Sequence, residues 1–401
     1  MSFDDRSLTI KDVSKFLNIS TQMVHILVRD GKLKAFKIGS AIRILYSDMV
    51  NFISLQKKEF QKSNIGFTNR DDQVFAVDNL SCSIGEFNLN NISFKIPRCK
   101  ILSILGSSGS GKTTLLKCIA GLIEKDSGRI FNGIKRMDEL NIKDRGIGFV
   151  FENYALFENL NAHNNIGFPL SIKRKKKDFI NNEVSKIAQE FNIDSKYLEK
   201  YVNELPEGIK QLVSIGREKI HDFDLLLMDE PLSKLDKNIS NKIVLFLKKL
   251  VINFNKTTII SLNDPELAIA LSDYILVLDN GELIQLGETW KVYNEPVSSL
   301  VAELTSRLGI NMLEVEVKNN SIDKYSLKAV LQDGNYKMYF RPDEVSLSDD
   351  GISVKIKNTS FYDGNKSLYT CLNEDKKEIK LLLTNNLQEK FKFIPVKPVF
   401  F

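Results

Sequence analysis

Residues 100–114 read Lys-Ile-Leu-Ser-Ile-Leu-Gly-Ser-Ser-Gly-Ser-Gly-Lys-Thr-Thr, and this stretch decides the fold of most of the chain. An apolar run typical of a buried strand enters a glycine-rich loop, and a helical pattern follows from Thr114. Gly106, Gly109 and Gly111 let the backbone curl so that its N–H groups and the helix N-terminus face an anion. Strand, loop and helix in this order predict a phosphate-binding loop.

The side chains of this loop indicate how a nucleotide is held. Lys112 supplies a point charge to the outer phosphates, and Thr113 supplies a hydroxyl for magnesium. The predicted phosphate-binding residues are Gly106, Ser107, Ser108, Gly109, Ser110, Gly111, Lys112, Thr113 and Thr114.

A second apolar run, Asp224-Leu-Leu-Leu-Met-Asp-Glu-Pro, delivers two acids at the end of a predicted strand. We expect Asp229 to hold magnesium through water, and Glu230 to polarise the attacking water as a general base. A core strand that merely ends in solvated acids also fits this run, but not the Ser233-Lys-Leu-Asp236 that follows it.

Order and spacing over residues 73–305 resemble an ABC-type ATPase, a P-loop α/β domain. The segments 151–160 (FENYALFENL) and 278–296 (LDNGELIQLGETWKVYNEP) are most similar to importer ATPases of the spermidine/putrescine, maltose and ferric-iron class. The resemblance implies ATP and Mg²⁺ as cofactors, with Thr113, Asp229 and Glu152 at the metal. It also implies a dimer formed through this domain, a membrane permease bound at 151–160, and Asp236 as the aspartate of the D-loop.

Residues 306–401 resemble the small C-terminal β-barrel (TOBE, OB-like) of the same importers. The segment 339–347 (YFRPDEVSL) is followed by three alternating runs that begin at Ser353, Ser367 and Glu378. A regulatory barrel is therefore expected, and dimer packing without a ligand is the interpretation we favour for it.

Four departures from the family pattern affect catalysis. Glu152 replaces a glutamine that contacts magnesium and the attacking water, and Asn263 replaces the switch histidine. Pro206 removes a hydroxyl and an N–H from the signature loop, and Glu207 puts an anion where a glycine lets the backbone approach. Loss of one such donor costs about 100- to 1,000-fold in rate. The altered signature comprises Leu205, Pro206, Glu207 and Gly208.

The aromatic residue that stacks on adenine in the family is replaced by Ile84, and Phe87 is either its substitute or a core residue. Because each site of an ABC dimer combines the P-loop of one subunit with the signature of the other, this chain impairs both sites of any pair. We therefore expect ATP binding with weak or absent hydrolysis, although Glu230 and Asp236 are retained.

Residues 1–57 carry most of the excess positive charge, with nine Lys or Arg against five Asp. Thr9 is a predicted cap for a first helix over 9–17, Ser20 caps a second over 21–30, and two strand-like runs around a Gly-Ser turn form a wing. Residues 7–56, with a last helix from Ser47, resemble the excisionase and MerR-type winged helix-turn-helix. The alternative is a packing module that never touches DNA. By this resemblance, DNA would be contacted by Thr21, Gln22, His25, Arg29, Lys37 and Arg43.

Residues 58–72 are polar and without periodicity, as expected of a linker. The composition, 43% hydrophobic and 27% charged, is that of a soluble globular protein, and we expect a cytoplasmic protein, or one peripheral on the inner face of the cell membrane. The four cysteines lack the spacing of a disulfide framework or zinc site. The run Lys173–Lys177 precedes a helix whose apolar side holds Phe179, Ile180, Val184, Ile187 and Phe191. A solvated surface is the favoured interpretation of the run, and contact with anionic lipid or DNA is the alternative.

Three interpretations of function remain open from the sequence. One is the ATP-binding subunit of an importer of the polyamine, sugar or iron class, with DNA binding as an added output. Another is an ATP-responsive transcription regulator derived from such a subunit, in which nucleotide sets the spacing of two winged helices. An inactive assembly partner is the third and plainest alternative.

Overall fold

The computed structural model describes residues 7–17, 24, 28, 33–38, 41–45, 48, 74–221, 223–234, 248, 256–325, 327–329, 331–363, 366–384, 387 and 389–401. The chain divides into two compact units, Met1–Asn69 and Arg70–Phe401. The predicted linker, residues 58–72, lies outside the described residues.

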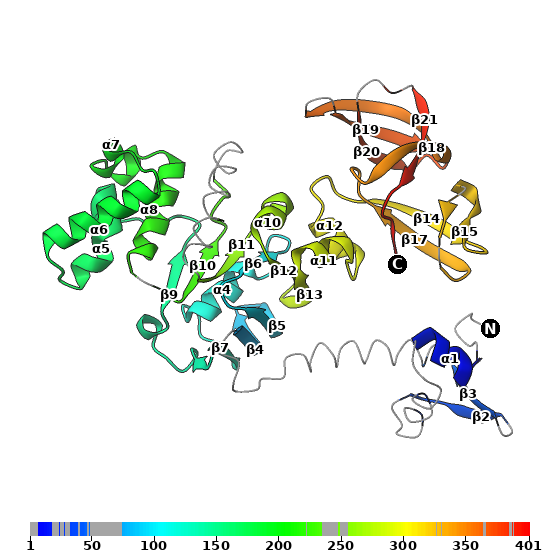
Figure 1. Ribbon diagram of the computed structural model, residues 1–401, viewed down its shortest axis with the longest axis horizontal. Coiled ribbons are helices and arrows are strands. Elements are labelled where there is room, and N and C mark those ends of the chain that lie inside the picture. Colours follow the sequence, from blue (N-terminus) through cyan, green and yellow to red (C-terminus); the bar gives the residue numbers. More distant parts are fainter. Residues whose placement is uncertain are drawn as a thin grey trace. The chain divides into compact units, whose positions relative to one another are not determined.

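The N-terminal unit contains a small sheet and one described helix (Figure 1). Strand β1 (Ser7–Thr9) leads into α1 (Ile10–Leu17), and β2 (Phe36–Ile38) and β3 (Ala41–Leu45) form the predicted wing. All pairings are antiparallel in the order β1-β3-β2, so β1 adds a strand that the sequence analysis did not predict. Thr9 caps α1 as predicted, since its hydroxyl accepts a 3.1 Å hydrogen bond from the backbone N–H of Asp12. Among the described residues, the small hydrophobic core of the N-terminal unit consists of Val13, Val24, Leu33 and Ile44.

The second unit is built on a six-stranded sheet in the order β13-β12-β6-β11-β10-β9. Its strands are parallel except for the edge strand β13. Three of the inner strands are buried along their whole length, and two of them, 101–105 and 225–229, are apolar at four of their five positions. The strand bounds are β6 Ile101–Leu105, β9 Ile147–Val150, β10 Leu225–Asp229, β11 Thr257–Ser261, β12 Tyr274–Asp279 and β13 Glu282–Glu288.

An antiparallel sheet, β5-β4-β7-β8, shares a hydrophobic core with one face of the six-stranded sheet and with helix α4 (Lys112–Ala120). Helix α4 begins two residues earlier than the sequence analysis predicted, so Lys112 and Thr113 belong to its first turn. The bounds of this second sheet are β4 Val74–Ile84, β5 Phe87–Pro97, β7 Ser127–Asn132 and β8 Lys135–Arg136.

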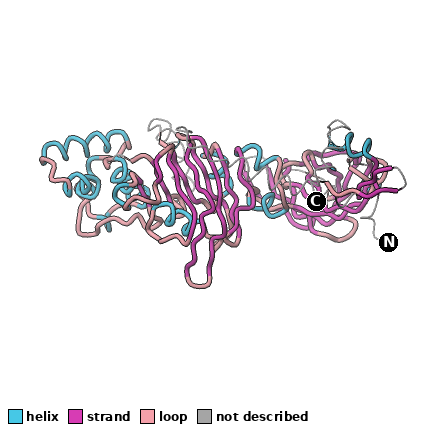
Figure 2. The backbone as a smooth tube through the Cα atoms, turned by 90° about the horizontal axis from the view of Figure 1, so that it is seen from below, coloured by secondary structure: helices cyan, strands magenta, loops and turns pink. Residues whose placement is uncertain are grey.

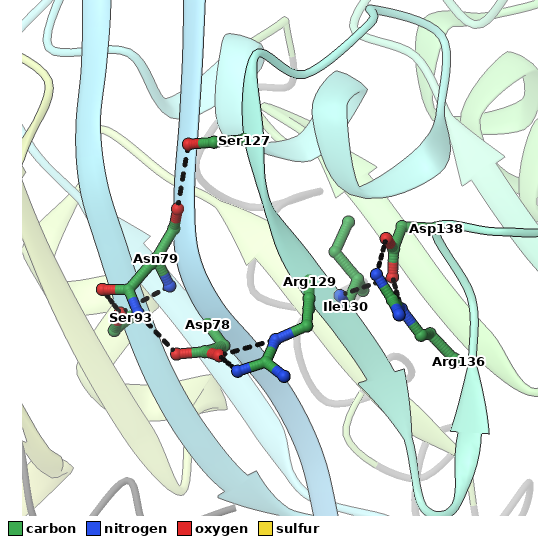
Figure 3. A network of polar contacts seen from close by, with 8 residues as sticks. All are labelled: Asp78, Asn79, Ser93, Ser127, Arg129, Ile130, Arg136 and Asp138. Carbon is green, nitrogen blue, oxygen red and sulfur yellow. Dashed lines mark hydrogen bonds and ion pairs between the residues drawn. The ribbon is translucent and has the colours of Figure 1, made fainter.

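Polar contacts fix this sheet at its surface (Figure 3). The Arg129 guanidinium on β7 donates to the largely buried Asp78 carboxylate on β4, at 2.5 Å from Nη2 and 3.0 Å from Nε. Asp138 accepts a 2.9 Å hydrogen bond from the backbone N–H of Ile130. These side chains hold β7 to its neighbours where β4 has register shifts.

Helices cover the other face of the six-stranded sheet, and α5 to α8 gather at one side of the strands (Figures 1 and 2). A Cβ on Gly167 of α5 would lie 2.7 Å from the Ile180 side chain of α6, so glycine permits close packing of the two helices. Val184, Ile187 and Phe191 are buried as predicted, whereas Phe179 is 47% exposed, so its predicted place on the apolar side is wrong. The helix bounds are α5 Ala162–Ile172, α6 Lys177–Glu190, α7 Ser195–Leu198, α8 Glu207–Lys219, α10 Pro265–Leu271, α11 Thr289–Asn294 and α12 Ser299–Leu304; the 3-10 turns are η2 Ile142–Asp144, η3 Val202–Glu204 and η4 Asp323–Tyr325.

The C-terminal strands form a three-stranded sheet β14-β17-β22, a hairpin β15-β16 and a four-stranded sheet β20-β19-β18-β21 around one core. The predicted runs from Ser353, Ser367 and Glu378 all lie in strands. These strands make antiparallel sheets, and closure into a barrel stays a proposal. Their bounds are β14 Asn311–Val317, β15 Ser321–Ile322, β16 Leu327–Lys328, β17 Gly334–Phe340, β18 Val345–Asp363, β19 Lys366–Asn373, β20 Glu378–Thr384, β21 Lys390–Pro395 and β22 Val399–Phe400.

Arg341, from the predicted segment 339–347, joins the C-terminal strands to α11 and α12. Its guanidinium lies 3.8 Å from the centre of the Tyr293 ring and donates to the Tyr293 carbonyl at 2.7 Å and the Thr305 hydroxyl at 3.1 Å. The side chain is almost fully buried, so these contacts replace water around its charge.

Candidate nucleotide-binding site

The glycine-rich loop follows β6 and ends at the first turn of α4, as the sequence predicts. A Cβ on Gly106 would clash with the Leu278 carbonyl oxygen of β12. Gly109 and Gly111 have φ values of 81° and 105°, a region that side-chain-bearing residues rarely adopt. Glycine is therefore required here by close approach at one position and by backbone conformation at two.

Lys112 is 7% exposed, and its ammonium lies inside the loop. Its Nζ donates to the carbonyl oxygens of Gly106 at 2.9 Å and Ser107 at 3.0 Å. Burial lowers the pKa of Lys112, while the charges of Glu230 and Asp229 act in the opposite direction. A buried cation beside the cradle is the electrostatic feature that suits a nucleotide's phosphates.

Asp229 lies at the end of β10 and is surrounded by hydroxyl groups. Its Oδ1 accepts hydrogen bonds from Thr113 Oγ1 at 2.9 Å and from Ser261 Oγ at 2.8 Å. Asp229 and Ser261 are paired in register on adjacent parallel strands. The sequence analysis assigned no role to Ser261, and a lone serine carries no motif that could have revealed one. Ser261 Oγ also accepts from the backbone N–H of Glu230 at 2.9 Å.

Glu230 follows β10 in a left-handed conformation, with φ of 45°. Burial raises its pKa to about 7; the Asp229 and Glu152 charges add to the rise, and Lys112 and the Asn263 backbone oppose it. Its Oε1 is buried and has no hydrogen-bond partner among the described residues. A carboxyl group with this pKa is partly protonated at neutral pH. A general base is most effective when its pKa lies near the pH at which the protein works.

These elements surround a cavity of about 470 Å³. The predicted residues Glu152, Glu230 and Asn263 converge on it with the phosphate-binding loop, and Ile84 and Phe87 complete one wall. Ile84 is 42% exposed, and the Phe87 ring also packs over Gly111, so Phe87 is both a wall and a core residue. The described lining is Ile84, Phe87, Ser108, Gly109, Gly111, Lys112, Thr113, Thr114, Glu152, Glu230 and Asn263.

The oxygen ligands in this cavity fit magnesium bound together with a nucleoside triphosphate. The Thr113 hydroxyl and the Asp229 carboxylate, already in contact, are hard oxygen ligands of the kind Mg²⁺ prefers. Glu152, exposed on the cavity wall, adds a third oxygen donor. In the described part of the chain, no group of three or more His, Cys, Asp or Glu is placed so that it could hold a metal ion by itself.

The altered signature lies at the start of α8, outside the residues that line the cavity. Pro206 precedes the helix as its N-cap residue, and Glu207 is the first helical residue. The Glu207 carboxylate accepts from Lys210 Nζ at 2.7 Å, and this hydrogen bond lowers the pKa of Glu207. The anion is thus held at the helix N-terminus, where the dipole favours it.

The segment 151–160 is anchored to α8 by Arg217 and Ser214. Tyr154 and Ala155 have positive φ, and their carbonyl oxygens accept from the Arg217 guanidinium at 3.3 Å and 2.6 Å. Ser214 Oγ donates to the Tyr154 carbonyl at 3.1 Å. The predicted permease-contacting loop and the signature helix therefore form one connected element, a link that the sequence did not reveal.

Two predicted DNA-contacting residues fall within the described wing. Lys37 lies in β2 and Arg43 in the paired strand β3, where its side chain is half-buried. Thr21, Gln22, His25 and Arg29 lie outside the described residues, as does Asp236 of the predicted D-loop. Cys82, Cys118 and Cys371 are buried free thiols, and Cys99 is half-buried.

Fold and site together define a P-loop nucleotide-binding protein. The ABC transporter model matches residues 89–233, and the helix-turn-helix domain model matches residues 7–54. The sulfate/thiosulfate import ATP-binding protein CysA of Mesostigma viride is 32% identical over 294 residues, which cover 72% of this chain and 84% of that protein. The spermidine/putrescine import ATP-binding protein PotA of Borreliella afzelii is 36% identical over 243 residues, covering 60% of this chain and 70% of that protein.

Among solved structures, cbiO1 from Clostridium perfringens, part of the ABC transporter complex cbiONQ, superimposes with a TM-score of 0.52 at 25% identity. The match covers 56% of this chain and 92% of that one. The chain therefore belongs to the family of ABC transporter ATP-binding proteins, with relatives that serve import. The described residues include no helix long and apolar enough to cross a membrane.

Proposed function

We propose that this chain is the ATP-binding subunit of an ABC importer, that it binds ATP with Mg²⁺, and that it hydrolyses ATP slowly or not at all. The observation that most supports this proposal is the cavity of about 470 Å³, which has an intact phosphate-binding loop but substituted side chains at its mouth. Magnesium bound there would neutralise phosphate charge and orient the nucleotide. Thr113 and Asp229 are the residues we assign to it, with Glu152 beside them.

Binding is supported by the loop itself. Every glycine that the cradle needs is present, and Lys112 and the Thr113–Asp229 contact are in place. The substitutions Glu152 and Asn263 are both exposed on the cavity wall rather than in the cradle. They therefore leave the groups that hold the phosphates unchanged.

Slow hydrolysis is supported by four side chains. Glu152 adds a negative charge near Glu230, and Asn263 cannot act as a proton-linked cation. Pro206 has no backbone N–H. Glu207 presents a carboxylate at the start of α8, where a phosphate would need a hydrogen-bond donor.

A dimer is supported by the incompleteness of the cavity. Its described lining comes from the P-loop side of the domain and includes no residue of 205–208. A second subunit, either another copy or a related ATPase, is therefore needed to bring a signature helix to the nucleotide. We propose that the C-terminal strands form a small barrel that packs in this dimer.

A membrane permease is supported by the segment 151–160, whose backbone carbonyls are fixed to α8 by Arg217. Docking there would place the protein at the inner face of the cell membrane. The matched relatives import spermidine/putrescine and sulfate/thiosulfate. For this chain we propose a solute of the polyamine, sugar or iron class.

The helix-turn-helix match favours a second candidate, an ATP-responsive regulator that binds double-stranded DNA. Its support is the paired wing strands that carry Lys37 and Arg43. In this candidate the nucleotide-bound dimer would set the spacing of two winged helices.

One set of measurements tests both candidates. Equilibrium binding of Mg²⁺-ATP and its hydrolysis are measured for the wild type and for a combined variant, Glu152→Gln, Pro206→Ser, Glu207→Gly and Asn263→His. We expect similar ATP affinity and at least about 100-fold faster hydrolysis in the combined variant. Wild-type hydrolysis as fast as that of the variant would refute the proposal of impaired catalysis.

Lys112→Ala is the control that should lose ATP binding in either background. Duplex DNA binding is then measured with and without Mg²⁺-ATP. DNA binding that requires nucleotide supports the regulator and contradicts a plain transporter subunit, whereas no DNA binding in either condition rejects the regulator.

A further inference from the structure

The turn between α5 and α6 forms an exposed surface that the nucleotide site does not use. It consists of Ile172, the five cations Lys173–Lys177, and Phe179, which we call the basic tip. All of these side chains are exposed. Ile172 is 65% exposed and Phe179 is 47% exposed.

The cations of the basic tip are not neutralised within the described part of the chain. None of the five forms an ion pair there, whereas Lys186, further along α6, pairs with Glu183 at 2.6 Å. The Lys175 ammonium lies 6.0 Å from the centre of the Phe179 ring. Asp178 is the single acid within the turn, so the tip keeps a strong net positive charge.

The local backbone is not what helix stability alone would select. Arg174 has φ of 52°, where glycine or asparagine is the usual residue, and its N–H donates to the Ser171 carbonyl at 2.9 Å. Lys176 stands at the N-cap of α6 without a side-chain cap hydrogen bond, and Lys177 begins the helix. Cations at this end oppose the helix dipole. An external anion at the tip would offset this unfavourable charge.

The apolar side chains decide which anion fits. Ile180 and Val184 of α6 pack against α5, whereas Phe179 is exposed with the Lys175 ammonium beside its ring, and Ile172 is exposed at the end of α5. A phosphodiester backbone offers charge but no apolar layer, whereas a lipid surface offers anionic headgroups above hydrocarbon. A run of cations with a large exposed apolar side chain at each end therefore favours lipid over nucleic acid.

We propose that the basic tip binds the anionic headgroups of a lipid bilayer directly, with Phe179 and Ile172 entering the boundary between headgroups and acyl chains. This contact requires neither ATP nor a permease, so it goes beyond the proposed function and fails or holds independently of it.

The test uses the full chain and sedimentation with vesicles of phosphatidylcholine, with or without phosphatidylglycerol. Each cation near an anionic surface strengthens binding by about fivefold, so Lys173→Gln, Lys175→Gln and Lys176→Gln together should weaken binding by about 100-fold. The matched control replaces Lys380, Lys390 and Lys392, which are exposed on the C-terminal strands, by Gln. It should bind like the wild type.

Insertion is tested separately by fluorescence. In a Trp290→Phe background, Phe179→Trp provides the single tryptophan of the chain, and its emission should shift to the blue with phosphatidylglycerol vesicles only. Equal losses in the tip and control variants would overturn the proposal, because the binding would then reflect overall charge. Unchanged vesicle binding of the tip variant, or loss of duplex DNA binding in its place, would also overturn it.

Discussion

Replacing Glu230 by Gln should stabilise the protein, and the gain should grow with pH. Burial holds the pKa of Glu230 at about 7, against an ordinary value of 4.5. Between these two values the folded state binds a proton that the unfolded state has released. The stability of the wild type therefore falls as pH rises from about 4.5 to 7, and the contribution is constant above that range. Glutamine has no proton to lose, so this loss is absent from the variant.

The difference between the two pKa values corresponds to at most about 3 kcal/mol. Glu230 is only half-buried, and solvent screening reduces the expected gain to about 1–2 kcal/mol. The free energy of unfolding of the wild type and of Glu230→Gln is measured with urea at pH 5 and pH 8. We expect the two curves to be close at pH 5 and to differ by about 1–2 kcal/mol at pH 8, with the variant more stable.

Glu282→Gln, at an exposed position of β13, is the matched control and should show no pH-dependent gain. A Glu230→Gln variant with the same stability advantage at both pH values would refute the reasoning. That result would mean that the carboxyl group is already charged at pH 5 in the folded protein.

Three further substitutions test the contacts around the site. Gly106→Ala forces a methyl group against the Leu278 carbonyl and should weaken Mg²⁺-ATP binding at least about tenfold by titration calorimetry; a wild-type affinity would contradict the close approach. Arg217→Met removes both hydrogen bonds to the Tyr154 and Ala155 carbonyl oxygens and should lower the free energy of unfolding by about 1–3 kcal/mol, measured with urea, whereas an unchanged value would show that the anchor is unimportant. Arg341→Met removes the stack on Tyr293 and the hydrogen bond to Thr305, so we expect the free energy of unfolding to fall by about 2 kcal/mol. In a time course of limited proteolysis, the variant should be cleaved faster between α12 and the C-terminal strands. Equal cleavage of the wild type and the variant would show that Arg341 does not hold these elements together.

Much of the fold followed from local patterns. The runs 101–105 and 225–229 are apolar at four of five positions because both faces of a central parallel strand are covered, and the structure confirms both strands. Phe179 shows where the pattern failed, since helical periodicity gives the angle of a side chain but not the point where the neighbouring helix ends. Strand β1 was also missed, because three residues carry too little pattern to predict a strand.

The site was predicted in part because its motifs are contiguous. Residues 106–114 and Asp229–Glu230 each lie on one loop or strand end, so their convergence follows from the order of a parallel sheet. Ser261 could not be found in the same way, because a lone serine at a strand end has no signature, and its role depends on register with Asp229. The anchoring of residues 154 and 155 by Arg217 likewise joins segments about sixty residues apart.

The positions of the substitutions explain why ATP binding and hydrolysis can be separated in this chain, as we propose. The groups that hold phosphate are backbone N–H groups and Lys112, and they are fixed by β6, α4 and the contact with β12. Glu152 and Asn263 lie beyond them at the exposed wall; the Glu152 charge acts on Glu230, and neither side chain belongs to the cradle. The signature helix contributes nothing to the same cavity, so Pro206 and Glu207 can weaken only a site completed by a second subunit. A nucleotide that binds firmly and is hydrolysed slowly would keep such a pair of subunits together, and a long-lived pair is what the proposed DNA-spacing regulator would require.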